Sequence, residues 1–130
     1  MATCGVWMTA RRLVAVAVDE CGVVLGATQS AWRSDEARWD LVSSLEAHHG
    51  LDCTFVVAET LHASDELSRI AARRGARVLV APDRLVEPAC LLNGIRRASP
   101  HRLAMLLARM PLCQPFADRL VRLELQLPLF

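Results

Sequence analysis

Two acidic residues each lie just past the end of a short apolar segment that has the composition of a buried strand, and they are the first candidates for chemistry. They are Glu59 and Asp83. In an open α/β sheet, ligands bind beyond the carboxyl ends of the parallel strands, and carboxylate oxygens are ligands that Mg²⁺ prefers. Together with Glu87, these residues are candidates for a divalent-metal site. The alternative is structural, because acidic residues after a strand more often cap a helix or meet an arginine such as Arg84.

The cysteines and histidines form no recognisable metal-binding pattern. The five cysteines are odd in number, have no C-x-x-C spacing and have mostly apolar neighbours. We therefore predict reduced thiols in the core of a cytoplasmic protein. The histidines have no second ligand at zinc spacing. No cofactor is expected, except Mg²⁺ if the carboxylates act. The cysteines are Cys4, Cys21, Cys53, Cys90 and Cys113.

Length and composition fit one folded domain. The chain has 130 residues, of which 53% are hydrophobic, so a disordered protein is excluded. We expect no signal peptide and no membrane span. The formal net charge of +1 gives no global attraction to nucleic acid, so any DNA binding would depend on local arginine clusters. The candidate clusters, which equally fit solvated helix ends and loops, are Arg11-Arg12, Arg73-Arg74-Arg77 and Arg96-Arg97-Arg102.

The pattern of apolar residues and turn signals predicts the elements that position these groups. Five segments have the length and composition of strands. They are residues 3–8, 13–18, 23–29, 53–58 and 77–81. Four segments have helix caps or helical periodicity. They are residues 35–49, 65–74, 83–92 and 100–110. A leading antiparallel meander that feeds parallel strands through crossover helices predicts an α/β mixed sheet with helices on both faces.

Four blocks of the chain, residues 5–26, 55–60, 77–86 and 98–109, together resemble the RuvC-like DEDD domain in the pilin-invertase class of insertion-sequence transposases, which has a ribonuclease H-like fold. Residues 5–26 are similar to the family's first strand and its D-x-x-G-x-V-L-G hairpin. Residues 55–60, FVVAET, resemble V-V-x-E-x-T/S, and residues 77–86, RVLVAPDRLV, resemble a strand ending in x-P-x-x-V. Residues 98–109, ASPHRLAMLLAR, lie where the family has K-T-D-x-x-D-A-x-x-L-A-R. The resemblance implies a ribonuclease H-like domain over residues 1–120.

The same resemblance implies a degenerate metal site. In the family, four carboxylates hold two divalent metal ions that catalyse phosphodiester transfer. The corresponding positions here are Trp7, Glu59, Pro100 and Leu103. One carboxylate cannot hold two Mg²⁺ ions, and an indole would fill the space of the metal cluster. The resemblance therefore implies that the nuclease or transposase chemistry is lost.

The last five residues, QLPLF, resemble the Q-L-x-L-F peptide with which bacterial polymerases, mismatch-repair proteins and some transposition proteins bind the replication sliding clamp. In this interpretation Gln126 reaches a small polar pocket, Leu127 turns the chain, and Leu129 and Phe130 fill an apolar cleft. The alternation of apolar and polar residues over 121–130 also fits an edge strand, against which the proline in the motif argues. Each interpretation can apply to one half of the segment.

Three functions are compatible with these patterns. The favoured one is a non-catalytic interaction module, residues 1–120, that a tail over residues 121–130 brings to the sliding clamp in replication, repair or mobile-element biology. The second is a divergent metal-dependent nuclease or resolvase that uses Glu59 and Asp83. The third is a structural homodimer formed through the last predicted helix, although the same apolar spacing fits a core. The residues concerned are Leu103, Leu106, Leu107 and Met110.

Overall fold

The computed structural model describes residues 2–30, 34–50, 52–60, 66–113 and 116–123. Its strands are β1 Thr3–Met8, β2 Leu13–Val18, β3 Val24–Ser30, β4 Thr54–Ala58, β5 Arg77–Ala81 and β6 Val121–Arg122. Its α-helices are α1 Asp35–His49, α3 Leu67–Arg73, α4 Val86–Leu92 and α5 Pro100–Arg109. Short 3₁₀ turns occur at Asp83–Leu85, Met110–Leu112 and Ala117–Arg119. None of the described helices is long and apolar enough to cross a bilayer.

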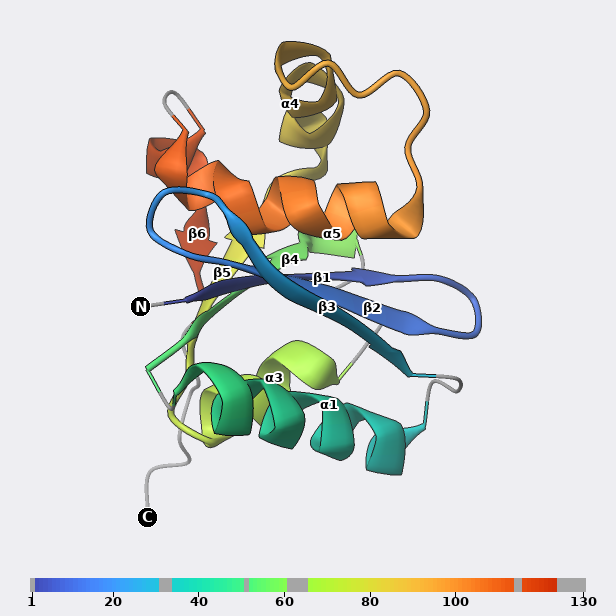
Figure 1. Ribbon diagram of the computed structural model, residues 1–130, viewed down its shortest axis with the longest axis vertical. Coiled ribbons are helices and arrows are strands. Elements are labelled where there is room, and N and C mark those ends of the chain that lie inside the picture. Colours follow the sequence, from blue (N-terminus) through green and yellow to red (C-terminus); the bar gives the residue numbers. More distant parts are fainter. Residues whose placement is uncertain (1, 31–33, 51, 61–65, 114–115, 124–130) are drawn as a thin grey trace.

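The six strands in the described part of the chain form one mixed sheet in the order β3-β2-β1-β4-β5-β6. β1, β2 and β3 make an antiparallel meander, β1, β4 and β5 are parallel, and β6 is antiparallel to β5. α1 and α3 cover one face of the sheet, while α5 lies across the other face with α4 beyond it (Figure 1). This arrangement confirms the predicted α/β mixed sheet with helices on both faces.

Local capping chemistry sets the helix ends where the sequence predicts them. The Ser34 hydroxyl accepts a hydrogen bond from the amide of Ala37 at 3.1 Å and begins α1. Gly50, at a positive φ of 96°, ends it, as the left-handed conformation favours glycine. The Ser99 hydroxyl accepts from the amide of Arg102 at 3.2 Å and begins α5.

Some predicted boundaries differ from the structure. The predicted strand over residues 23–29 is shifted by one residue, since β3 is Val24–Ser30. The predicted helix over residues 83–92 divides into a 3₁₀ turn and α4. Pro111 does not stop the helical run, which continues as a 3₁₀ turn to Leu112, because proline is tolerated in the first turn of a helical segment. The predicted start of the second helix, at residue 65, lies outside the described residues, and the described helix α3 ends at Arg73.

The edge-strand interpretation is confirmed for the first residues of the tail. Val121 and Arg122 pair with Val80 and Leu79 of β5, and the amide of Leu123 donates to the carbonyl of Val78 at 2.8 Å. The clamp-motif residues that follow lie outside the described residues.

On the face covered by α1 and α3, an ion pair with one buried partner joins α1 to the end of α3. Glu46 is only 5% exposed, and Arg74 donates from Nε and Nη2 to its two carboxylate oxygens, each at 3.0 Å. The Arg74 guanidinium also lies 5.3 Å from the centre of the Trp39 ring. Hydrogen bonding to Glu46 raises the pKa of Arg74 above its ordinary value. Arg74 is therefore a structural cation rather than part of a free arginine cluster.

The apolar residues of α5 belong mostly to the core. Leu106, Leu107 and Met110 are buried in the cluster between α5 and the sheet, so the core interpretation holds for them and the homodimer interpretation through this face of α5 is wrong. Leu103 is half-buried and lines a groove described below.

α5 approaches β1 very closely at Gly5. A Cβ atom added to Gly5 would lie 1.9 Å from the carbonyl oxygen of Ala104 and 2.5 Å from the amide nitrogen of Ala108. Ala104 and Ala108 are themselves fully buried. The backbone of α5 therefore rests directly on β1, and three small residues make this contact possible.

Replacing Gly5 by alanine is expected to lower the free energy of unfolding by about 3 kcal/mol or more, because the added methyl group would overlap the α5 backbone. The matched control is Gly26→Ala in β3, where the added methyl meets nothing within 4 Å and the free energy of unfolding should change by no more than about 1 kcal/mol. Urea denaturation followed by circular dichroism measures both. An equal loss in the two variants would contradict the close contact of α5 with β1.

Candidate functional site

An apolar groove of about 470 Å³ opens on the α5 side of the sheet. It lies between the carboxyl-terminal end of β1, the segment of α4 with the residues before and after it, and the first turn of α5. Apolar side chains make up most of its lining, and one arginine and two carboxylates add charge. The lining residues are Trp7, Asp83, Val86, Glu87, Cys90, Leu91, Ile95, Arg96, Ala98 and Leu103.

Trp7 is the lining residue that connects this groove to the core. It lies in β1 opposite Val14 of β2 and is half-buried. Its side chain packs against both apolar clusters on the α5 side, one centred on Leu106 and Leu107 and the other on Ala104 and neighbouring residues. A large aromatic ring at this point supplies burial. The groove is therefore joined directly to the core through Trp7.

The structure brings some of the predicted site residues together and separates others. Trp7 and Leu103 line the same groove, as do Asp83 and Glu87. Pro100, at the first position of α5, and Glu59, exposed after β4, are not among the lining residues.

Asp83 has a specific structural contact. Its Oδ1 accepts from the backbone amide of Thr60 at 3.2 Å, and its Oδ2 accepts from the Thr60 hydroxyl. These bonds tie the ends of β4 and β5 together and so hold Glu59, the neighbour of Thr60, near one edge of the groove. Among the described residues, no three His, Cys, Asp or Glu side chains form a group that could hold a metal ion, so Glu59, Asp83 and Glu87 do not form one.

Exposed arginines lie along the same side of the molecule as the groove. Arg96 lines it, and Arg97 and Arg102 are exposed in the adjoining loop and the first turn of α5. Arg102 Nη1 donates to the carbonyl of Arg97 at 3.3 Å. Of the three arginine clusters considered from sequence, Arg96-Arg97-Arg102 is the one that adjoins the groove. A nucleic acid in the groove would meet its positive charge.

Sequence reasoning missed the apolar part of the groove. Leu91 and Leu92 are 73% and 71% exposed, and Leu91 and Ile95 line the groove. The sequence did contain an indication of this exposed apolar surface, because two adjacent leucines near the end of a short helix cannot both face a core. Large apolar side chains left exposed beside a groove are typical of an interaction surface.

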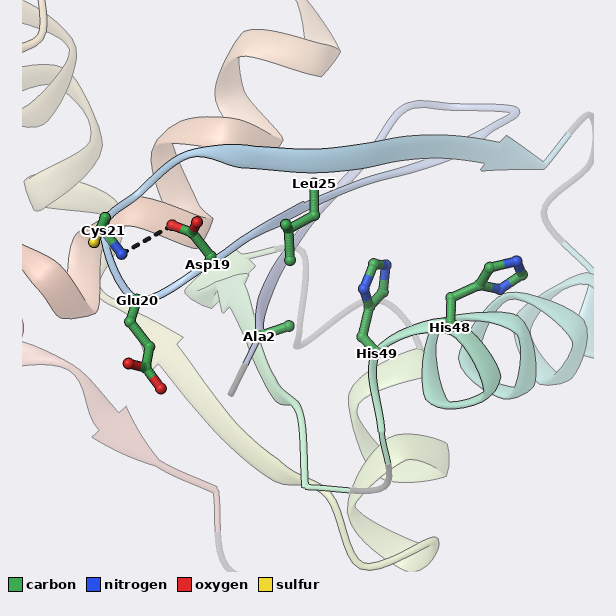
Figure 2. Close-up of a pocket in the computed structure, with 7 residues that line it drawn as sticks. All are labelled: Ala2, Asp19, Glu20, Cys21, Leu25, His48 and His49. Atoms are coloured by element: carbon green, nitrogen blue, oxygen red, sulfur yellow. Dashed lines mark hydrogen bonds between the residues drawn. The ribbon is translucent and has the colours of Figure 1, made fainter.

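A second hollow, of about 410 Å³, lies between the β2–β3 turn and the end of α1 (Figure 2). Its polar groups serve the turn and the helix. Asp19 Oδ1 accepts from the amides of Cys21 at 2.8 Å and Val23 at 2.9 Å, and His48 Nδ1 lies 2.8 Å from the carbonyl of Ser44. The acidic residues and the histidines occupy opposite sides of the hollow in Figure 2. The lining residues are Ala2, Asp19, Glu20, Cys21, Leu25, His48 and His49.

The cysteines are only partly as predicted. Cys4 and Cys53 are fully buried, whereas Cys21 is exposed and Cys90 and Cys113 are half-buried. Hydrogen bonding to Cys53, with burial as the second cause, raises the pKa of the Cys4 thiol above its ordinary value. Burial and then the charge of Glu87 raise the pKa of Cys90. Core thiols are thus confirmed for Cys4 and Cys53, and the prediction is wrong for Cys21 because that residue lies in the β2–β3 turn.

Comparison with solved structures identifies the fold. The Thermus thermophilus RuvC structure superposes with a TM-score of 0.60 at 12% identity, over 95% of this chain and 100% of RuvC. The fold is ribonuclease H-like. T. thermophilus RuvC in complex with a Holliday junction substrate gives a TM-score of 0.55 at 14% identity, over 83% of this chain and 90% of that one. No family model and no curated protein match the sequence, and at these identities the likeness to RuvC establishes the ribonuclease H-like fold alone.

Replacing Trp7 by aspartate is expected to lower the free energy of unfolding by about 2 to 4 kcal/mol, because the indole contacts with two apolar clusters are lost and a carboxylate enters their place. Trp7→Phe is the matched control and should lose no more than about half as much, since it keeps an aromatic ring. Guanidinium denaturation measures both. A Trp7→Asp variant as stable as the unchanged protein would contradict the packing role of the indole.

Proposed function

We propose that this protein is a non-catalytic ribonuclease H-like interaction module that binds the bacterial replication sliding clamp through its C-terminal QLPLF peptide. It would act in the cytoplasm, in DNA replication, repair or mobile-element biology. The observation that carries the non-catalytic part is the groove whose mostly apolar lining includes both Trp7 and Leu103. The clamp-binding part is supported by the sequence of the last five residues.

The residues present do not fit a two-metal centre. By the resemblance to the transposase domain, Trp7, Glu59, Pro100 and Leu103 occupy the positions of the four metal ligands. Indole, pyrrolidine and isobutyl groups cannot coordinate a divalent cation, and one carboxylate does not hold two. The proposal therefore includes no hydrolytic or transfer step.

The position of the peptide in the chain supports its proposed role. The sheet contacts of the tail include the bond from Leu123 to Val78, and two residues separate Leu123 from Gln126. The sequence therefore places the peptide only two residues beyond the last sheet contact of the described residues. Leu129 and Phe130 would be the buried anchors, because large apolar side chains in a desolvated pocket supply most of the energy in such contacts.

The full chain is expected to bind purified bacterial sliding clamp, and a chain ending at Glu124 is expected not to bind. Replacing Leu129 or Phe130 by alanine should weaken binding by about 1 to 3 kcal/mol each, and Gln126→Ala should also weaken it, because each removes a pocket contact. Isothermal titration calorimetry measures these affinities.

Pro128→Ala is the matched control for the peptide, because Pro128 occupies the variable position of the Q-L-x-L-F pattern. It should retain the affinity of the unchanged chain. Equal binding by the full and shortened chains, or binding by neither, would rule out the clamp as a partner of this peptide.

A divergent nuclease or resolvase is the second candidate. It is favoured by the bonds from Thr60 to Asp83, which join the ends of two parallel strands where ligands bind in α/β sheets, and by the likeness to RuvC, which in one solved structure is bound to a Holliday junction substrate. In this case Glu59 and Asp83 would carry the chemistry, with Mg²⁺ as the implied cofactor. DNA would enter the groove beside Arg96.

The full chain is expected to leave a Holliday junction and single-stranded DNA uncut in the presence of Mg²⁺ or Mn²⁺. Denaturing electrophoresis of end-labelled strands measures this, and Glu59→Gln and Asp83→Asn are run beside the unchanged chain. Divalent-dependent cleavage that both variants lose would overturn the non-catalytic proposal and establish the second candidate. Cleavage retained by both variants would indicate a contaminating nuclease.

A further inference from the structure

Two cysteines from neighbouring strands lie in the core between the sheet and the helices α1 and α3. Cys4 is the second residue of β1, and Cys53 directly precedes β4. The two strands are parallel neighbours, with Cys4 opposite Phe55. Cys53 precedes Phe55 by two positions, the spacing at which extended residues share a face of the sheet. All three side chains belong to the apolar cluster that α1 and α3 cover, so both thiols point to the same side.

The two thiols are held in contact by the sheet. The amide of Thr54 donates to the carbonyl of Ala2 at 3.1 Å, which fixes the starts of β1 and β4 to each other beside the cysteines. A hydrogen bond links the thiol groups of Cys4 and Cys53. Both residues are fully buried and neither is in a disulfide. A disulfide forms only between residues whose backbones are close, and this pair meets that condition.

The two thiols differ in their surroundings. Cys4 lies inside β1, between β2 and β4, whereas Cys53 lies between α1 and β4, next to the exposed Asp52. The hydrogen bond from Cys4 lowers the pKa of Cys53, although burial and the charge of Glu46 act in the opposite direction. The same bond raises the pKa of Cys4. Because the thiolate is the nucleophile, Cys53 is the thiol suited to react first and Cys4 the one suited to react second.

We propose that Cys4 and Cys53 form a reversible disulfide on reaction with hydrogen peroxide. This inference is independent of the proposed function. The Cys53 thiolate attacks one peroxide oxygen, the O–O bond breaks, and Cys53 becomes a sulfenic acid while hydroxide leaves and takes up the proton that Cys53 had lost. The Cys4 sulfur then attacks the Cys53 sulfur, and the sulfenic hydroxyl leaves with the Cys4 proton as water. In total the two thiols lose two electrons and two protons, and the peroxide is reduced to two molecules of water.

A small oxidant suits this pair because both thiols are covered. The hollow of Figure 2 lies close by, since Ala2 lines it and accepts a hydrogen bond from Thr54, the residue after Cys53. Element ends open more readily than strand centres, and an opening at the starts of β1 and β4 would admit a molecule little larger than water. The resulting bond would join two central strands of the sheet and restrict the unfolded chain between residues 4 and 53, which stabilises the folded form.

The full chain, treated with hydrogen peroxide and then with catalase, is expected to give a peptide crosslinked between Cys4 and Cys53 in non-reducing peptide mapping by mass spectrometry. Its Tm should rise by about 5 °C or more, and dithiothreitol should reverse both changes. Cys21→Ser is the matched control, because Cys21 is exposed in the β2–β3 turn and takes no part in the proposed bond. This variant should give the same crosslink and the same rise in Tm.

A pair of single variants tests the order of the two steps. After peroxide treatment and unfolding in dimedone, Cys4→Ser should carry the dimedone adduct of a sulfenic acid on Cys53, whereas Cys53→Ser should leave Cys4 unmodified. If either variant does not fold, the map of the unchanged chain decides. Cys4 and Cys53 that stay reduced while Cys21 is oxidised, or that pair with other cysteines, overturn the proposal. A crosslink that leaves the Tm unchanged or lowers it also overturns it, because such a bond would not form between the folded strands.

Discussion

The direct contact of the α5 backbone with β1 at Gly5 is the constraint on which the α5 side of the molecule depends. Helices usually pack on sheets through side chains, which hold the two backbones apart. Here Gly5 contributes no side chain and Ala104 and Ala108 contribute one methyl group each. The α5 backbone therefore lies closer to β1 than the backbone of a helix that packs through larger side chains. Its first turn, which carries Leu103, is fixed by the same contact.

Trp7 is the counterpart of Gly5 on the same face of the same strand. Residues two apart in a strand point to one face, so Gly5 admits the helix and Trp7 fills the volume that opens beyond it, toward α4. This pairing of the smallest and largest side chains explains why the indole packs against two clusters at once. It also explains why the groove is lined chiefly by apolar groups, because Trp7 and Leu103 extend the core outward to the surface.

The elements were predictable from sequence where their signals are local. The strand Leu13–Val18 follows from a run of neighbouring apolar residues. The helix starts at Ser34 and Ser99 follow from side chains that bond an amide three residues further on, which is short-range chemistry. The bonds of Thr60 to Asp83 and of Arg74 to Glu46 join residues 23 and 28 positions apart. No periodicity encodes such contacts, so the partners of these polar groups could be seen only in three dimensions.

For the candidate site, the sequence identified the residues that differ from the transposase pattern but not what surrounds them. Four converging carboxylates repel one another and need bound cations to share a site. Under the proposed function, Trp7 and Leu103 remove that repulsion, and the sheet can be stable without metal. Under the same proposal the change has a second consequence, because the apolar groups that replace ligands are only partly covered by the domain: Trp7 and Leu103 are both half-buried. The exposed Leu91 lines the same groove as these residues, so under this proposal loss of the metal chemistry and gain of an apolar contact surface would be two results of the same substitutions.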